Sequence, residues 1–221
     1  MDVKIKDLLD LNQTIASELF LRFEYPWEVL PFIKDFILEI GPKLDKDVYQ
    51  QVNDDIWIAK SAKIAKTVEL NGPLIVCEDA EIRQCAYIRG CAIVGAGATV
   101  GNSVELKNCI LFNCAQVPHY NYIGDSVIGY KSHIGAGGIT SNLKSDKSNV
   151  FVKSTDGQNI ETGLRKFGAI LGDNVEVGCN SVLNPGTVIG RGTNVYPTSC
   201  VRGFVPANSI FKTPDNIVSK R

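Results

Sequence analysis

A six-residue periodicity runs through most of this chain and limits its fold more than any other feature. From Ile58 onward, every sixth residue is a branched apolar or aromatic one, and the residue after it is usually small or polar. The first run consists of Ile58, Ile64, Leu70, Val76, Ile82, Ile88, Val94, Val100, Leu106 and Phe112. The series breaks at Pro118. The later positions are Ile128, Ile134, Leu171, Val177, Leu183, Ile189, Val195 and Val201.

A period of six excludes the common secondary structures. An α-helix repeats at about 3.6 residues, and an open, half-buried strand repeats at about 2. A coil with three short sides, each one hexapeptide long with one inward side chain, does repeat at six. Such a coil holds about 18 residues, and successive coils stack at about 4.8 Å, the spacing of hydrogen-bonded strands. The repeat therefore predicts an all-β fold, a parallel β-helix, for residues 53–221.

The first 52 residues lack the six-residue pattern and are predicted to be helical. Apolar residues recur at helical spacing from Asp7 to Phe20, and Glu28 to Ile40 is typical of a second helix that Gly41 ends. Because a solenoid has open ends that must be covered, we predict that residues 1–52 form a small helical N-terminal cap. An oligomer contact and a substrate lid remain alternatives for this segment.

A second interruption, at 141–168, is polar and charged and carries no apolar series. A loop of this length in a regular solenoid is usually functional or disordered. We predict that it forms an arm projecting from the β-helix near the active site.

Composition and charge exclude several classes of partner. The formal net charge is −1, so electrostatics give no reason to expect nucleic acid or an anionic membrane. The longest apolar runs are far too short to span a bilayer, and the first residues lack the apolar stretch of a secretory signal. The seven cysteines include no CxxC pair, and two histidines are too few for the zinc site of a solenoid carbonic anhydrase. We therefore predict a reduced, cytoplasmic protein without a bound metal.

Two cations, Arg89 and Lys107, are separated by 18 residues (107 − 89), so they should lie one above the other on successive coils. Two like charges about 5 Å apart repel by roughly 1 kcal/mol in water and by roughly 3 kcal/mol at an effective dielectric constant of about 20. A bound anion would relieve this repulsion, as would the nearby carboxylate of Glu105. The spacing thus indicates an anion site, with two solvated surface cations as the alternative.

His119 lies where the six-residue pattern breaks, in the stretch from Val117 to Tyr122. Side chains at such a break need not point into the core, and an imidazole can accept a proton from an ammonium group near neutral pH. General base catalysis of this kind contributes about 10²–10⁴ in rate. A surface histidine packed against Tyr120 or Tyr122 is the alternative. Backbone N–H groups in the glycine-rich corner at 135–138 could hold an acyl carbonyl.

The stretch from about Ile88 to Asn142 resembles the acetyltransferase half of bacterial bifunctional UDP-N-acetylglucosamine pyrophosphorylase/glucosamine-1-phosphate N-acetyltransferase. The matching segments are Arg89-Gly90, Gly101–Lys107, His119, Tyr122–Asp125, Ile134–Gly137 and Ile139–Asn142. A looser resemblance in the hexapeptide pattern extends from about 58 to 210. It implies a left-handed parallel β-helix, an exception to the usual right-handed crossover rule, and a homotrimer with sites between subunits.

The resemblance also implies roles for individual side chains. His119 and Glu105 are implied as catalytic residues, and His119 would remove the proton from the sugar amine that attacks acetyl-CoA. Arg89 and Lys107 would hold the phosphate of the amino sugar. The other residues implied to bind the acceptor are Tyr122 and Asn142, and those implied to line the acyl-CoA cleft are Ala136, Gly137 and Cys179.

The chain departs from that family in the acceptor region. His133 stands where the family has an asparagine that touches the acceptor, so we assign His133 to the acceptor site. Leu143-Lys144 replaces a Tyr-Asp pair, and the loop that follows is longer. No glycine-rich nucleotide loop precedes the solenoid, so we expect the chain to lack the family's nucleotidyltransferase domain.

One functional hypothesis and two alternatives follow. We predict an acyltransferase that moves an acyl group, expected to be acetyl, from acyl-CoA to the amine of an amino-sugar phosphate or a nucleotide-linked amino sugar. One alternative is a non-catalytic trimer that binds a sugar phosphate. The other is a structural trimer whose helical cap recruits partners and which binds neither ligand.

Overall fold

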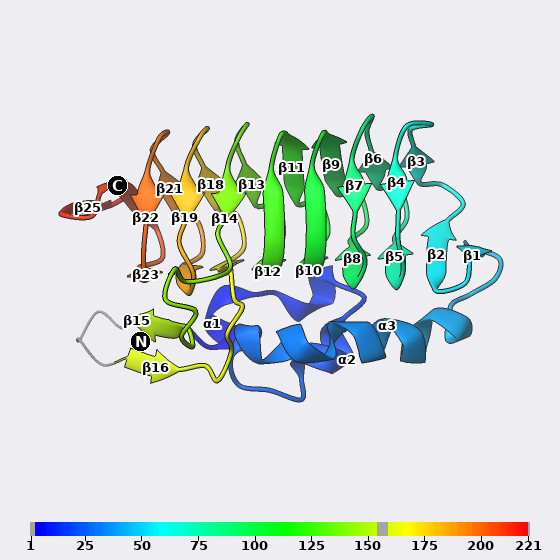
Figure 1. The fold of residues 1–221 in the computed structure, drawn as a ribbon, viewed down its shortest axis with the longest axis horizontal. Coiled ribbons are helices and arrows are strands. Elements are labelled where there is room, and N and C mark those ends of the chain that lie inside the picture. The colour runs from blue at the N-terminus through cyan, green and yellow to red at the C-terminus, as the bar shows by residue number, and fades with distance from the viewer. Residues whose placement is uncertain (1–2, 154–158, 221) are drawn as a thin grey trace.

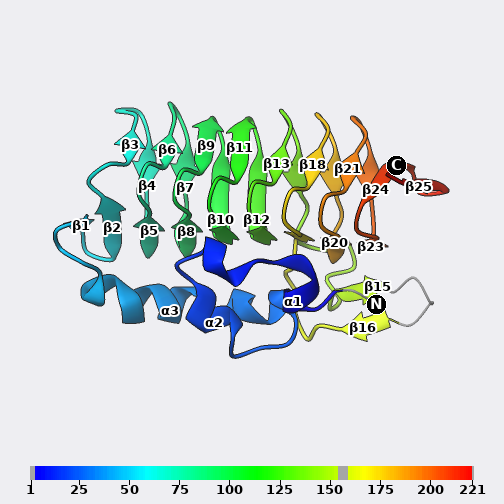
Figure 2. The same cartoon turned by 180° about the vertical axis from the view of Figure 1, so that it is seen from behind.

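The computed structural model describes residues 3–153 and 159–220 and shows a parallel β-helix of about eight coils beside a layer of short helices (Figure 1). Figure 2 shows the same two layers from behind. The solenoid is left-handed, and its strands pair in parallel from coil to coil, as the hexapeptide pattern and the resemblance predicted.

The coils contribute strands to three sides. The first side carries β2 (Ile56–Ala59), β5 (Leu74–Val76), β8 (Ala92–Val94), β17 (Ala169–Leu171), β20 (Thr187–Ile189) and β23 (Phe204–Val205). The second side carries β3 (Lys63–Ile64), β6 (Glu81–Ile82), β9 (Thr99–Asn102), β11 (Gln116–His119), β13 (His133–Ile134), β18 (Glu176–Val177), β21 (Asn194–Val195) and β24 (Ser209–Thr213). The third side carries β4 (Glu69–Leu70), β7 (Tyr87–Ile88), β14 (Ile139–Thr140), β19 (Val182–Leu183) and β22 (Cys200–Val201).

Two longer strands and two hairpins complete the solenoid. The strands β10 (Glu105–Leu111) and β12 (Tyr122–Ile128) run from the third side into the first without interruption. At the N-terminal end, β1 (Tyr49–Asn53) pairs antiparallel with β2, and at the C-terminal end β25 (Asn216–Ser219) pairs antiparallel with β24. The ends of the solenoid therefore carry antiparallel hairpins.

The inward apolar series follows the prediction up to Leu106 and then shifts by one residue. Leu111 occupies the next inward position, whereas Phe112 belongs to the outer apolar cluster and packs edge-on against Phe20 with ring centroids 5.3 Å apart. The prediction that Phe112 is an inward residue was wrong. Val117 continues the inward series, so Pro118 does not interrupt it.

A shortened coil explains this shift. The register pairs Leu111 with Val94 and Ile128 with Leu111. These coils hold 17 residues (111 − 94 and 128 − 111) instead of 18. The missing residue is taken from the corner that β10 and β12 cross as continuous strands, so the other sides keep their six-residue steps.

The helical segment lies along the first side of the β-helix instead of over an open end (Figure 1). It contains α1 (Ile5–Leu8), α2 (Ser17–Phe20) and α3 (Ile33–Ile40), and the 3-10 turns η1 (Leu11–Gln13), η2 (Pro26–Phe32) and η3 (Gly41–Lys43). Among the helices of the described ranges, none is long and apolar enough to cross a membrane.

The first side receives this layer because its strands are apolar on both faces, as is typical of buried parallel strands. Its outward side chains recur every 17 or 18 residues (127 − 110 and 75 − 57), apart from one step of 43 residues that contains the arm (170 − 127), and they are buried beneath the helices. They are Trp57, Ile75, Ile93, Ile110, Val127, Ile170 and Val188. This second apolar row in the sequence would have predicted that the helical layer packs on the first side.

Asp173 ties the layer to a corner of the solenoid. Its carboxylate accepts the backbone N–H groups of Asp10 at 2.7 Å and Tyr130 at 2.9 Å, and it lies 3.2 Å from a guanidinium nitrogen of Arg191. Burial raises the pKa of the Asp173 carboxyl group despite these partners. The layer is therefore held by directional bonds as well as by apolar burial.

Gly41 has a different role from the predicted helix stop. The helix α3 does end at Ile40, but Gly41 has a φ of −50° in the right-handed region. A Cβ atom at Gly41 would lie 2.5 Å from the Trp57 ring, so a glycine lets the chain pass closely over this ring.

The interruption at 141–168 forms an arm that lies beside the helical layer (Figures 1 and 2). Within it, β15 (Phe151–Lys153) and β16 (Asn159–Glu161) form an antiparallel hairpin. The Phe167 ring is buried, and its centroid lies 5.9 Å from that of the Trp27 ring. The arm thus shares an apolar cluster with the helical layer. The part of the predicted arm at 154–158 lies outside the described residues.

We expect Ile110→Ala to lower the free energy of unfolding by about 2–5 kcal/mol, because it opens a cavity between the first side and the helical layer. Ile139→Ala is the matched control, because Ile139 lies on the third side, is 39% exposed, and should cost about 1 kcal/mol or less. Urea unfolding followed by circular dichroism measures both variants. Equal losses would contradict the burial of the first side.

Candidate active site

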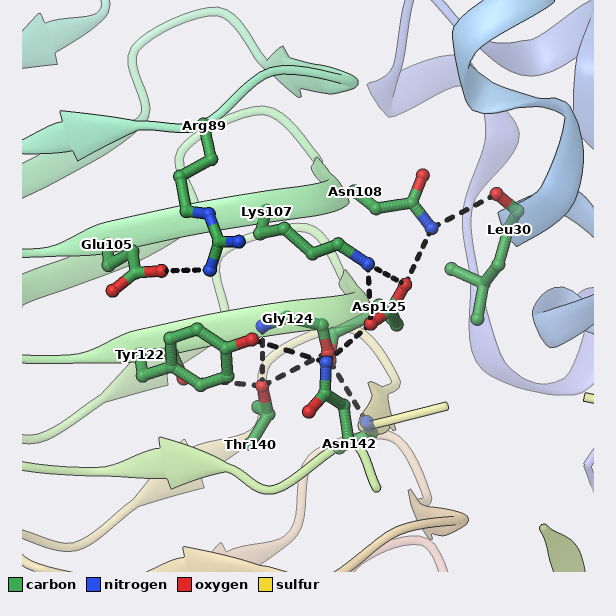
Figure 3. A network of polar contacts seen from close by, with 12 residues as sticks. Leu30, Arg89, Glu105, Lys107, Asn108, Tyr122, Gly124, Asp125, Thr140 and Asn142 are labelled. Atoms are coloured by element: carbon green, nitrogen blue, oxygen red, sulfur yellow. Dashed lines mark hydrogen bonds and ion pairs between the residues drawn. The ribbon is translucent and has the colours of Figure 1, made fainter. Parts of the chain in front are cut away.

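Arg89 and Lys107 lie side by side on neighbouring coils, and each has a carboxylate partner (Figure 3). The backbone N–H of Arg89 donates to the Leu106 carbonyl, which places the two cations next to each other. Arg89 Nη1 lies 2.7 Å from Glu105 Oε1, and Lys107 Nζ lies 2.8 and 3.0 Å from the two carboxylate oxygens of Asp125. The repulsion that we expected an anion to relieve is therefore relieved by two carboxylates.

Asp125 is the centre of this polar network, and the sequence pattern did not single it out. Its side chain is 4% exposed and accepts hydrogen bonds from Lys107, from Asn108 Nδ2 at 2.9 Å and from Asn142 Nδ2 at 2.5 Å. Asn108 Nδ2 also lies 3.2 Å from the Leu30 carbonyl oxygen in the helical layer. The spacing of 18 between Lys107 and Asp125 (125 − 107) was the available signal.

The corner that carries this network needs a left-handed backbone. Asn108 and Asp125 have φ values of 49° and 46°. Asn and Asp tolerate this region better than other non-glycine residues. The same two side chains therefore turn the chain and supply the polar groups of the network.

Tyr122 and Asn142 meet beside Asp125. Asn142 Nδ2 lies 3.2 Å from the Tyr122 hydroxyl oxygen, so one amide group contacts both neighbours. Thr140 accepts the Gly124 N–H at 2.9 Å and braces the same strand from inside. Burial, followed by the charge of Asp125, raises the pKa of the Tyr122 hydroxyl. Tyr122 therefore stays protonated at neutral pH and can donate a hydrogen bond.

His119 ends β11, at the corner between the second and third sides. Its Nδ1 lies 3.2 Å from Asn102 Oδ1. In a hydrogen bond to this amide oxygen, which only accepts, Nδ1 is the donor, and Nε2 is the ring nitrogen that remains to take up a proton. His119 is thus oriented for proton transfer at Nε2.

The buried Asn121 fixes this histidine corner to the glycine-rich corner of the next coil. Its Nδ2 donates to the carbonyls of Gly135 at 2.8 Å and Gly138 at 3.1 Å. Its Oδ1 accepts the backbone N–H of His119 at 3.1 Å. Asn121 gave no signal in the sequence pattern, because a polar side chain in a turn is common.

The glycine-rich corner uses most of its N–H groups internally. The backbone acceptors are the carbonyls of Val177 for Gly135, His119 for Gly137 and Gly135 for Gly138. Among the described residues, the Ala136 N–H has no acceptor. A Cβ atom at Gly137, which has a φ of 72°, would lie 2.3 Å from Asn180 Oδ1, so a larger residue there would be strained and would displace the Asn180 side chain.

Cys179 lies beside this corner on the following coil. The Asn180 N–H donates to the Ala136 carbonyl at 2.8 Å, and a Cβ atom at Gly135 would lie 3.0 Å from Cys179 Sγ. The Cys179 side chain is exposed. The three residues predicted to line the acyl-CoA cleft therefore lie along the same edge as His119.

His133 is brought together with Cys179 and not with the Asp125 network. It lies on β13, and its Nδ1 is 2.9 Å from Glu176 Oε2. With Cys179 and Tyr196 it lines a groove of about 360 Å³. The part of the chain that the structure describes holds no group of three or more His, Cys, Asp or Glu side chains suited to a metal ion.

Several known proteins are similar to this chain. The family described as the GMPPB C-terminal domain matches residues 70–190. The bifunctional sugar-1-phosphate nucleotidylyltransferase/acetyltransferase of Sulfurisphaera tokodaii is 31% identical over 230 residues, which cover 95% of this chain and 57% of that protein. The bifunctional protein GlmU of Methanococcus vannielii is 31% identical over 223 residues, which cover 98% of this chain and 53% of that protein. A point variant of AntD, an N-acyltransferase from Bacillus cereus, matches with a TM-score of 0.39 and 15% identity over 75% of this chain and 80% of that one.

Fold and site define a hexapeptide-repeat β-helix protein with a histidine corner and a glycine-rich corner on one edge. The chain belongs to the family of the GMPPB C-terminal domain, whose match covers 121 of its 221 residues (190 − 70 + 1). The resemblance to bifunctional enzymes with an acetyltransferase half is confirmed by these relatives. The chain spans about half the length of the curated relatives it matches.

We expect Lys107→Met to lower the free energy of unfolding by about 3–5 kcal/mol, because it leaves the Asp125 carboxylate buried without its cation. The double variant Lys107→Met/Asp125→Asn should recover most of this loss, since it removes the buried charge and keeps a residue that tolerates positive φ. Arg89→Ala breaks a more exposed pair and should cost less than about 1 kcal/mol. Urea unfolding measures all three, and a double variant no more stable than Lys107→Met would contradict the coupling.

Proposed function

We propose that this chain transfers an acetyl group from acetyl-CoA to the amine of an amino-sugar phosphate or a nucleotide-linked amino sugar. The proposal rests on the position of His119 and Ala136 at one edge of the β-helix, between its second and third sides. His119 Nε2 and the backbone N–H of Ala136, which has no acceptor among the described residues, both lie at this edge. The relatives named as acetyltransferases support the same reaction class.

The edge supplies the two groups that acyl transfer to an amine requires. The neutral amine nitrogen attacks the thioester carbonyl carbon, and His119 Nε2 takes a proton from that nitrogen. The carbonyl oxygen becomes an oxyanion, to which the Ala136 N–H donates a hydrogen bond. The carbon–sulfur bond then breaks, and the proton held by His119 passes to the leaving thiolate of CoA. Ala136, Gly137 and Cys179 line the path of the acyl-CoA.

The acceptor occupies the third side, between the His119 corner and the Asp125 network. Arg89 exchanges its Glu105 partner for the phosphate, because an exposed ion pair is weak and a guanidinium–phosphate contact is strong. Glu105 is then available near the amine. Tyr122 and Asn142 orient the sugar by hydrogen bonds. Lys107 is held in place by its ion pair with Asp125 and adds positive charge to the acceptor site.

A homotrimer is the assembly that we propose for this chain. The helical layer covers the first side, whereas the second and third sides expose the large side chains of Tyr87, Tyr120 and Tyr196. A partner packed on these sides would bury the apolar surface and close the edge that carries His119.

We expect His119→Ala to reduce kcat for acetyl transfer by about 10²–10⁴ with little change in acceptor affinity, because it removes the base and leaves the acceptor contacts in place. Release of the CoA thiol, with glucosamine 1-phosphate and a UDP-linked amino sugar as acceptors, measures the rate. Lys66→Ala is the control and should leave kcat unchanged, because Lys66 is an exposed side chain of the first coils, away from the edge that carries His119. A wild-type protein that binds an acceptor and transfers nothing would instead support the non-catalytic sugar-phosphate binder.

We expect acetyl-CoA to slow the alkylation of Cys179 by iodoacetamide, because the bound cofactor covers the edge that carries this thiol. Cys85 is the matched control, since it is also exposed but belongs to an earlier coil on the other side of His119. Mass spectrometry of the alkylated peptides measures both rates. Equal rates at Cys179 with and without acetyl-CoA would contradict the proposed cofactor path.

A further inference from the structure

A pocket of about 450 Å³ lies between the arm and the C-terminal coils. Its solenoid side includes residues 184–185 and 202–203, and its arm side includes Ser141, residues 143–146, Phe151 and Lys153. Figure 1 shows the arm hairpin beside these coils. The sequence pattern did not reveal this pocket, because its two sides come from segments with no common periodicity.

Two glycines let the arm lie against the coils. Gly186 and Gly203 have φ values of 82° and 80°. A Cβ atom at Gly186 would lie 2.5 Å from the Phe151 carbonyl oxygen, and one at Gly203 would lie 3.1 Å from Lys153 Cβ. The strand β15 therefore packs directly on two successive corners. Backbone packing, and not the placement of surface side chains, sets the shape of the pocket.

The lining of the pocket is basic. Among the described lining residues, Lys144, Lys153 and Arg202 are cations and Asp146 is the one carboxylate, so these residues carry a net charge of +2 (3 − 1). Lys144 Nζ lies 3.6 Å from Asp146 Oδ2, and Arg202 Nη2 lies 3.5 Å from Asn184 Oδ1. Lys144 also donates to the Ser148 hydroxyl and lies 5.5 Å from the centroid of the Phe151 ring, so it is held within the arm. The contact of Arg202 is long and weak, and an anion can replace it.

The same pocket offers apolar surface. Leu143 and Phe151 each remain 37% exposed, and Pro185 lies among the lining residues with them. A ligand that uses both kinds of surface carries phosphate groups together with a ring system. The volume is within the range of about 300–1,000 Å³ that is usual for small-molecule sites.

The pocket adjoins the proposed acceptor site. Ser141 and Leu143 of its lining flank Asn142, which contacts Tyr122 and Asp125. A ligand that places an amino sugar beside Tyr122 can therefore extend past Asn142 into the pocket.

We propose that this pocket binds the diphosphate and ring system of a nucleotide. The inference rests on the proposed function, because that reaction offers two sources of this chemistry: a nucleotide-linked amino sugar and CoA. The cations of the arm and of the coil corner hold the diphosphate, and the apolar side chains contact the ring.

Isothermal titration of UDP, GDP, dTDP, ADP and CoA into the full chain tests the pocket. In Lys153→Gln/Arg202→Gln we expect the affinity for the bound nucleotide to fall by about 10- to 100-fold, because two charge-assisted contacts are lost. Lys66→Gln is the matched control, since Lys66 is an exposed cation on the first coils and should leave the affinity unchanged. Thermal unfolding by circular dichroism checks that the double variant folds.

The outcomes separate the two sources and the two proposals. A loss confined to nucleoside diphosphates assigns the pocket to the acceptor, and a loss confined to CoA assigns it to the acyl donor. No binding by the wild type, or equal affinities in the wild type and the double variant, would overturn the proposal that this pocket binds a nucleotide. Acetyl transfer by the wild type to glucosamine 1-phosphate is measured in parallel. Its absence would overturn the proposed reaction, whereas nucleotide binding that depends on Lys153 and Arg202 would still support the pocket.

Discussion

Hydrogen bonds between parallel strands of successive coils set the position of each side chain in the candidate site. Because the coils around the candidate site hold 17 or 18 residues, apart from the one with the inserted arm, residues at that spacing become neighbours about 4.8 Å apart. One row of such neighbours fills the inner core, and another receives the helical layer. A third row holds Arg89 and Lys107 on the third side. A corner row places His119 beside the glycine-rich corner, so the fold itself brings a base and a backbone N–H group to one edge.

The Asp125 carboxylate gives the other end of the third side a fixed geometry. Burying a carboxylate is costly, and here the charge of Lys107 and two asparagine amides offset that cost. Such a network stabilises little overall, but it orients Lys107 and Asn142. Arg89 differs, because its pair with Glu105 is largely exposed and exchanges easily. The two cations that look equivalent in the sequence thus differ in their partners and their exposure.

The helical layer and the arm connect the rest of the chain to this site. The Leu30 carbonyl accepts from Asn108, which also donates to Asp125. The Phe167 ring at the end of the arm packs on Trp27 of the layer. Because the layer covers the first side, the second and third sides are left for the ligands and partner subunits that we propose. The N-terminal segment therefore supports the proposed acceptor region through the corner between the third and first sides, although it supplies none of the proposed catalytic groups.

The sequence by itself determined the solenoid, because a period of six is a local property that a three-sided coil satisfies. It also determined most of the inward residues and, through a specific resemblance, the candidate side chains from Arg89 to Cys179. Only the tertiary structure decided that Phe112 faces outward, because one residue lost at a corner is invisible to a count of hexapeptides. It alone showed that the side chains of Asp125 and Asn121 are buried and hydrogen-bonded to other residues, since distance and burial are set only when the chain has folded. The tertiary structure also revealed the pocket between the arm and the C-terminal coils, because the two sides of this pocket meet only after the chain has folded.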